Sequence, residues 1–528
     1  MKLMYKFKFF LSTILVVVIS ASSCKKESLQ LVNPNQPGEA SLLSEEGVRR
    51  FALGIYNKPG LNFWWLALAN HDIMGDSYYI PWGNFGWRWV NQTTSITRPS
   101  GVVLTPPQGG EQKVELKARN DRSFADDNAF RHEWQSMYFI NNQVNILLDN
   151  LGNISFTGNA DTKRKALRSW AYWWKGYCYS RIGGMYIAGL INDQSNVASN
   201  NFVSSDRMIQ EGNANFDKAI AELTGIADNN ADFLSIISGI IPDFTKVGRG
   251  GNLTPSEIIR QINTYKARNI LIAKSPAQLS TAEWNSIITL CNNGLREGDK
   301  MLTIRSANEN DFVGITGWAP WRLLNGWFFV SERLVQDFNP VDARLTRNIT
   351  TLGAPIVNQS GRGFQYGTRY TLRDIGVGGN WASSTVGLAE QPVGTTYEEN
   401  QLMLAEAKIY TNDIAGAVTH INNVRSFLVS NLTPLVGTIS RTAVLEELRK
   451  ERRIGLFLKN VAFYDARRWG VINPVSQGGG RTGANVVFAG GVVEPCTINY
   501  NYMRYWDVPL NELDFNIPSS TSVPVANN

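Results

Sequence analysis

The sequence predicts an all-α scaffold of paired helices, with long irregular loops that hold only minor short strands. Three observations lead to this prediction. Apolar residues recur at helical spacing in segments spread along most of the chain. Two neighbouring segments near the C-terminus carry small residues, which allow close helix packing. Long stretches rich in glycine, proline and aromatic residues separate the helical segments.

The N-terminus has the pattern of a secretory signal. Basic residues precede an apolar run from 9 to 19, and small residues follow it directly before Cys24. The run is shorter than the roughly 20 residues of a membrane-spanning helix. Small residues before a cysteine resemble a bacterial lipoprotein signal, although Ala21 stands where leucine is usual; an ordinary cleaved signal is the alternative. We predict a signal peptide at 1–23, a lipid anchor on Cys24 and a flexible tether at 24–41.

Composition narrows the class of protein. Hydrophobic residues make up 43% of the chain and charged residues 18%, which is ordinary for a globular protein. Apart from the run from Leu448 to Arg453, the basic residues behind the formal net charge of +6 are scattered, so no nucleic-acid footprint is present. Cys178, Cys291 and Cys496 are spaced too widely for a disulfide framework or a metal pattern. We expect them to be buried small hydrophobes, and one disulfide remains possible.

Residues 42–528 are predicted to form one α-helical domain. Helical periodicity covers 44–56, 133–151, 163–182, 216–226, 254–273, 280–294, 397–410, 414–428 and 442–457. The scaffold therefore lies mainly in 44–56, 130–300 and 397–470. The pair formed by 397–410 and 414–428 is similar to tetratricopeptide helical pairs, although no clean repeat of roughly 34 residues occurs. The stretches 57–127 and 303–396 are predicted to be the main loops.

Several C-terminal motifs occur in a recognisable order. They are Glu399 with Leu404-Ala405-Glu406-Ala407, Asn422-Asn423-Val424-Arg425, Glu451-Arg452 with Leu456, Asp465 and Arg468-Trp469-Gly470, and Trp506-Asp507-Val508-Pro509 with Glu512-Leu513. Together they resemble the SusD/RagB family of outer-membrane nutrient-binding lipoproteins. Gly455, Lys459 and Ala462 depart from the pattern, since that family commonly has Glu, Glu and Arg there. The last motif also lacks its first proline.

The charged residues of this signature are interpreted as a packing network. Arg452 shares a helical stripe with Val444, Leu448 and Leu456, so we expect it to point toward the interior. A buried charge needs a partner. The candidate partners are Glu451, Asp465 and Glu406.

The resemblance implies a non-enzymatic lipoprotein of the outer membrane, facing the outside of the cell. It further implies that the protein captures glycan and delivers it to a SusC-like TonB-dependent outer-membrane transporter, with no cofactor. Peptide is the alternative cargo in this family. The rival hypotheses are a secreted α-helical polysaccharide-degrading enzyme and a purely structural surface protein.

Tryptophans concentrate in the two main loop stretches. Flat rings held on stiff loops suit stacking on the C–H faces of sugars, while neighbouring polar side chains can bond the hydroxyls. The candidate glycan-binding residues are Trp82, Trp87, Trp89, Trp318 and Trp321, with Asn84, Arg88 and Arg322 as hydrogen-bonding partners. The alternative is that these rings fill the core. We expect that alternative for the helix-borne Trp134, Trp170, Trp173 and Trp174.

Catalytic and cofactor motifs give no strong signal. The three histidines, His71, His132 and His420, lie far apart, so neither a metal site nor a histidine-based triad is expected. The stretch 478–483 matches GxGxxG, but no strand precedes it and no helix is expected after it. Paired carboxylates could cleave glycosides only if the fold brought them together. The candidate pairs are Asp72 with Asp76 and Glu309 with Asp311, which we interpret as solvated or turn-capping acids.

Overall fold

The structure is a computed structural model that describes residues 42–56, 66–81, 85–107, 109–243, 246, 249–306, 328–358, 364–373 and 389–527. The predicted signal peptide at 1–23 and the predicted tether at 24–41, with Cys24, lie outside these residues.

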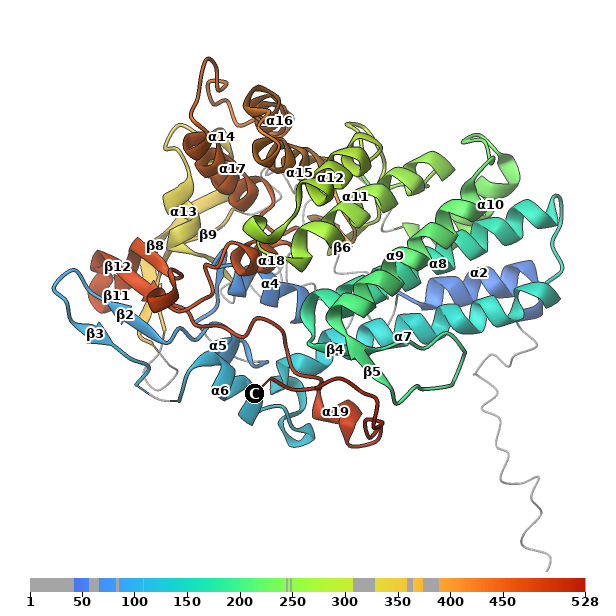
Figure 1. Cartoon of the computed structure of the whole chain (residues 1–528), viewed down its shortest axis with the longest axis horizontal. Helices are drawn as coiled ribbons and strands as arrows, with labels where there is room; N and C mark the ends of the chain where they lie inside the picture. The colour runs from blue at the N-terminus through green and yellow to red at the C-terminus, as the bar shows by residue number, and fades with distance from the viewer. Residues whose placement is uncertain are drawn as a thin grey trace, which may run out of the picture.

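The N-terminal half of the scaffold consists of helices that lie side by side (Figure 1). They are α2 (Glu45–Gly54), α7 (Ala129–Asn150), α8 (Ala160–Met185), α9 (Ser205–Leu223), α10 (Ala231–Ile240), α11 (Pro255–Ala273) and α12 (Thr281–Asn292). Helices α8 and α9 approach closely because glycines face the partner helix. A Cβ on Gly176 would lie 2.5 Å from the Phe216 ring, and one on Gly212 would lie 2.4 Å from Ser180 Oγ. Any larger residue at either position would push the two helices apart.

The C-terminal half contains α15 (Tyr397–Tyr410), α16 (Ile414–Phe427), α17 (Arg441–Gly455) and α18 (Ala462–Arg468). The predicted pair 397–410 and 414–428 is confirmed as α15 and α16. A short turn joins them, and Asn412 has a φ of 67°, a conformation that asparagine tolerates better than most residues. Ala405 and Ala417 are fully buried in the cluster that α15, α16 and α17 share. The small residues therefore allow the close packing that the sequence predicts.

An antiparallel sheet of eight strands is the main departure from the predicted all-α fold. Its order is β1 (Tyr78–Tyr79), β7 (Phe329–Val330), β9 (Tyr366–Leu372), β11 (Arg481–Phe488), β12 (Val493–Asn499), β2 (Ser95–Thr97) and β3 (Val103–Leu104), and β8 (Ile349–Val357) pairs with β9. Most strands are short and come from distant parts of the chain, so no single segment shows the alternation of a strand. The stretches predicted to be loops therefore contribute much of this sheet.

The remaining elements are short. Two more strand pairs are β6 (Thr303–Ser306) with β10 (Ala389–Pro392) and β4 (Ala188–Leu190) with β5 (Phe202–Ser204). The short helices are α4 (Leu68–Met74), α5 (Trp87–Val90), α6 (Gln112–Ala118), α13 (Glu332–Asp337), α14 (Ala343–Asn348) and α19 (Leu510–Leu513). Single 3-10 turns lie at Arg122–Asp127, Leu151–Asn153, Pro276–Gln278, Val475–Gln477 and Ala489–Gly491.

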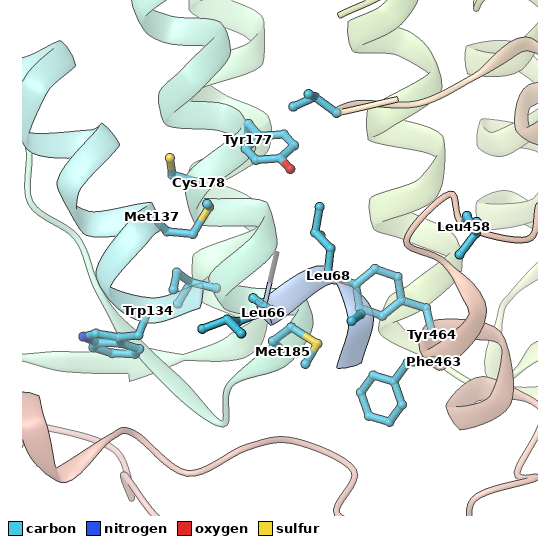
Figure 2. Close-up of a cluster of buried hydrophobic side chains, with 14 of the residues drawn as sticks. Leu66, Leu68, Trp134, Met137, Tyr177, Cys178, Met185, Leu458, Phe463 and Tyr464 are labelled. Carbon is cyan, nitrogen blue, oxygen red and sulfur yellow. The ribbon is translucent and has the colours of Figure 1, made fainter. Parts of the chain in front are cut away.

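One large hydrophobic cluster joins the helices to the sheet. Figure 2 shows Trp134 and Tyr177 from α7 and α8 on one side of Leu68, and Phe463 and Tyr464 from α18 on the other. All four helix-borne tryptophans expected in the core are buried. The three described cysteines are buried and free, so the possible disulfide does not form. Among the described residues, no helix is both long enough and apolar enough to cross a membrane.

Candidate ligand-binding site

The structure describes three of the eight predicted glycan-binding residues, Trp87, Arg88 and Trp89. The other five, Trp82, Asn84, Trp318, Trp321 and Arg322, lie outside the described residues.

The Trp87 ring is a core residue, contrary to the expectation of an exposed platform. Helix α5 begins after Gly86, whose φ of 75° turns the chain beside the main-chain oxygen of Asp127. This turn sends Trp87 inward, where its ring centroid lies 5.3 Å from Phe85 and 4.9 Å from Phe328. The side chain is fully buried. It therefore presents no face to a sugar, and its prediction as a glycan-binding residue is wrong.

Trp89 is also covered, in this case by cations. The guanidinium groups of Arg88 and Arg119 lie 3.9 and 3.6 Å from its ring centroid. Arg119 is itself paired with Glu115 on α6. The ring is 6% exposed, so cation–π contacts occupy the π surface that a sugar would need. The predicted roles of Trp89 as a platform and Arg88 as its hydrogen-bonding neighbour do not fit this arrangement.

The first candidate carboxylate pair is buried and shows no catalytic arrangement. Asp76 accepts hydrogen bonds from Ser331 Oγ at 2.8 Å and Tyr500 Oη at 2.6 Å, and its carboxylate lies 2.7 Å from Arg333 Nη2. Burial alone would raise the pKa of Asp76, but the charge of Arg333 holds it well below its usual range. Asp72 accepts one bond from the Leu458 main-chain N–H at 3.3 Å. Burial raises the pKa of Asp72 to about 7.

Neither of these carboxylates lines the two open cavities described below. The second candidate pair, Glu309 and Asp311, lies outside the described residues.

The C-terminal signature forms the buried ion-pair network that the sequence predicts. Arg452 Nε lies 2.8 Å from Asp465 Oδ2, and Arg468 Nε lies 2.8 Å from Asp465 Oδ1. Arg468 also reaches Glu406, with Nη2 to Oε2 at 2.6 Å. Burial would raise the pKa of Asp465, but its two arginines hold it below the ordinary value. The prediction that Arg452 points inward and pairs with a signature carboxylate is confirmed.

A second branch of this network joins two further motifs. Glu451 Oε2 accepts from Arg425 Nε at 3.2 Å and from Arg344 Nη2 at 3.0 Å. Arg344 is closed on its other side by Asp342, at 2.8 Å. The motif around Arg425 is thus tied to the Glu451-Arg452 motif, and the charges on α16 and α17 neutralise one another inside the protein.

Two open cavities flank helix α17. The larger has a volume of about 560 Å³, and we call it the α14–α17 groove. Its lining includes Phe338, Pro340, Val341, Leu432, Leu435 and Ile454. The smaller has a volume of about 190 Å³, and we call it the α17–β11 pocket. Its lining includes Arg449, Lys450, Arg453, Asp465, Trp469 and Arg481. Asp337 and Lys450 line both cavities, which therefore adjoin.

Sequence reasoning missed this pair of cavities. The run from Leu448 to Arg453 was visible as a cluster of basic residues, and Trp469 as part of the signature. The charged residues of the signature, however, indicated a packing network and not a binding site. What the sequence could not indicate is that Arg481, from the start of β11, joins them beside α17.

In the described part of the chain, no group of three or more histidine, cysteine or acidic side chains could hold a metal ion. The GxGxxG match at 478–483 runs into strand β11 rather than into a helix. It therefore lacks the helix N-terminus that would face a phosphate.

The part of the chain that carries this C-terminal signature also matches a known protein family. Residues 333–516 match the SusD family. This C-terminal part of the chain is therefore SusD-like. The match spans helices α13 to α19 and the ion pairs around Glu451 and Asp465. No curated protein matches the chain.

Solved SusD-like structures share the fold over most of the chain. A SusD-like carbohydrate binding protein from Bacteroides fragilis is 14% identical, with a TM-score of 0.60 over 90% of this chain and 99% of its own. A SusD superfamily protein from Parabacteroides distasonis is 12% identical, with a TM-score of 0.54 over 90% and 97%. A structure with xylogluco-oligosaccharide is 12% identical, with a TM-score of 0.57 over 91% and 99%. At such identities the likeness shows the fold.

The departures from the SusD signature have structural reasons in this chain. A Cβ on Gly455 would lie 3.0 Å from Glu451 Oε1 and 3.2 Å from Leu428, so a glutamate would crowd the network and add like charge. Ala462 packs against Gly75, where a Cβ would come within 2.4 Å of it. Lys459 forms an ion pair with buried Glu398 at 2.9 Å. Each departure therefore fits a local contact.

Proposed function

We propose that this SusD-like chain is a lipid-anchored protein of the outer-membrane surface that captures glycan. It delivers the glycan to a SusC-like TonB-dependent transporter. One observation carries the proposal: the chain has, over 90% of its length, the fold of a SusD-like carbohydrate binding protein. The relative with xylogluco-oligosaccharide adds support, because it shows that this fold accommodates an oligosaccharide.

The described carboxylates favour binding over catalysis. A glycosidase needs two carboxyl groups facing the scissile bond across an open site. Asp76 is sealed by Arg333 and Tyr500, and Asp72 is fully buried. A glycan array on the purified protein, combined with chromatography of the incubated glycans, tests the proposal. Retention of intact glycan supports it, whereas release of shorter oligosaccharides supports the polysaccharide-degrading enzyme, and retention of peptides alone supports the other cargo.

The proposed sugar-stacking residues are Trp82, Trp318 and Trp321, with Asn84 and Arg322 as hydrogen-bonding partners. Replacing Trp318 or Trp321 with alanine is expected to weaken glycan binding by about 1–3 kcal/mol, the scale of burying one large side chain. Isothermal titration calorimetry measures the change. Thermal stability should stay close to that of the parent protein, because an exposed ring contributes little to the core.

Trp87→Ala is the matched control, because it removes an indole that the structure buries. We expect it to lower the melting temperature markedly. If Trp318→Ala and Trp321→Ala lower the melting temperature as much as Trp87→Ala does, these rings belong to the core and the proposed site is misplaced.

Membrane attachment depends on Cys24 in this proposal. Cys24→Ser is expected to move the protein from the membrane fraction to the soluble fraction, because lipidation requires the thiol. Immunoblotting of separated fractions measures the shift, with Cys178→Ser as a control that keeps the proposed anchor. Persistence of the Cys24→Ser protein in the membrane fraction would contradict the lipid anchor.

A further inference from the structure

The α17–β11 pocket carries more positive charge than its own carboxylates neutralise. Asp465 is already paired with Arg452 and Arg468, and Asp337 with Arg453. Within the described residues, Arg449 and Lys450 form no ion pair, although Glu446, which also lines the pocket, lies one turn earlier on the same helix. Among the described residues, Arg481 forms an ion pair with Asp76 at 3.5 Å, and Asp76 is held more closely by Arg333 at 2.7 Å.

Three arginines of the pocket also have unused hydrogen-bond donors. The Nε atoms of Arg449, Arg453 and Arg481 are buried, and none has a hydrogen-bond partner among the described residues. Buried N–H groups in folded proteins almost always find an acceptor. Burial, followed by the charge of Arg481, lowers the pKa of Arg453. Both features indicate that the carboxylates of the pocket leave these donors without an acceptor.

The adjoining α14–α17 groove shows the opposite arrangement. Its arginines, Arg344 and Arg425, form ion pairs with carboxylates that line the same groove. These carboxylates belong to Asp342, Glu447 and Glu451. The excess of positive charge is therefore a property of the pocket and not of this whole face of α17.

The shape of the pocket suits one substituent of a larger molecule. Its volume of about 190 Å³ is below the roughly 300–1,000 Å³ of pockets that enclose drug-sized ligands. The half-buried Trp469 ring lines it, and the Arg449 guanidinium lies 5.7 Å from that ring's centroid. Guanidinium groups bind carboxylate and sulfate through paired N–H donors, and an indole offers a flat surface to a sugar ring.

We propose that the α17–β11 pocket binds the carboxylate or sulfate group of an acidic glycan. The proposal rests on the proposed function, because it takes the ligand to be a glycan. Arg449 and Lys450 supply the free charge, Arg453 and Arg481 supply buried donors, and the neighbouring groove leaves room for adjacent sugars.

Calorimetry on the detergent-solubilised full-chain protein tests this assignment. Two pairs of probes separate the sources of negative charge: tetragalacturonate against its methyl ester, and a carrageenan tetrasaccharide against its desulfated form. We expect the acidic member of one pair to bind at least tenfold more tightly than its neutral counterpart. The pair that shows the preference identifies the group as carboxylate or sulfate.

Arg449→Gln and Lys450→Gln test the residues. Each is expected to reduce the ratio of acidic to neutral affinity about tenfold, while Arg449→Lys should restore much of it. Arg441→Gln is the matched control, because Arg441 lies on the same helix and lines neither cavity. The variants should keep the parent melting temperature, since Arg449 and Lys450 hold no ion pair in the described structure.

Equal affinity for acidic and neutral probes, or variants that do not change the ratio, would overturn the anion pocket while leaving glycan capture intact. If neither these probes nor the glycan array showed binding, the proposed function and this inference would both fail.

Discussion

Arg468→Met is expected to lower the free energy of unfolding by about 3–5 kcal/mol, the usual cost of leaving buried charges without their partner. Arg468 is fully buried and contacts both Glu406 and Asp465. Methionine fills a similar space but donates no hydrogen bond. Without Arg468, Asp465 keeps only Arg452, and Glu406 keeps only a 3.4 Å contact with Trp469 Nε1. Urea denaturation followed by tryptophan fluorescence measures the change.

The double variant Glu406→Leu/Arg468→Met makes this expectation sharper. Because it removes both charges of one pair, it should regain part of the loss seen in Arg468→Met. Arg50→Met is the surface control, since its pair with Glu46 is exposed, and it should stay within about 0.5 kcal/mol of the parent. A loss below about 1 kcal/mol in Arg468→Met would contradict a network that holds α15 to α18 together.

Asp76→Asn is expected to cost about 3–5 kcal/mol at neutral pH, because buried Arg333 loses its counter-charge. The asparagine amide would also direct N–H groups at donors that now bond to the carboxylate, including Arg333 and Tyr500 Oη. The site joins the start of β1 to α13 and β11, so its loss should loosen the sheet. Chemical denaturation at pH 7 measures the difference.

The pH dependence gives Asp76→Asn a second readout. The folded protein holds the pKa of Asp76 below the ordinary value of about 3.9. The unfolded chain therefore binds this proton first as the pH falls, and the contribution of Asp76 to stability is present above about pH 4 and lost below it. The parent protein should lose stability between about pH 5 and 2, and the variant should lose less. Parallel curves for the two proteins would contradict the pairing.

Helix periodicity was enough to predict most of the scaffold. The expected segments 163–182 and 397–410 correspond to α8 and α15, with ends that differ by a few residues at most. The reason is that a long amphipathic helix carries its own pattern, repeated over several turns. The strands of the sheet carry no such repeating pattern in the sequence. Strands such as Tyr78–Tyr79 and Phe329–Val330 are two residues long and pair across about 250 positions, so only the folded chain brings them together.

The binding residues were harder to predict, for a related reason. Trp87 and Trp89 have the aromatic character of a sugar platform, but whether a ring is exposed depends on what packs over it. Phe328 covers Trp87, and Arg119 covers Trp89. Both neighbours lie far along the chain from the tryptophans that they cover, so the sequence does not reveal these contacts. The core role of Trp134 was predictable, because a helical face that also carries other apolar residues must be buried.

By itself, the sequence determined the positions of most of the long helices, the inward orientation of Arg452 and its need for a carboxylate partner; the expected segment 216–226 captured only the second half of α9 (Ser205–Leu223). These properties follow from the 3.6-residue period and from the cost of an unpaired buried charge, both of which act locally. The tertiary structure alone decided that Asp465 and Glu406 share Arg468, that Trp87 is internal, and that Arg481 and Arg449 line the same pocket beside α17. Exposure and the balance of charge depend on neighbours distant in the chain, and folding alone selects those neighbours.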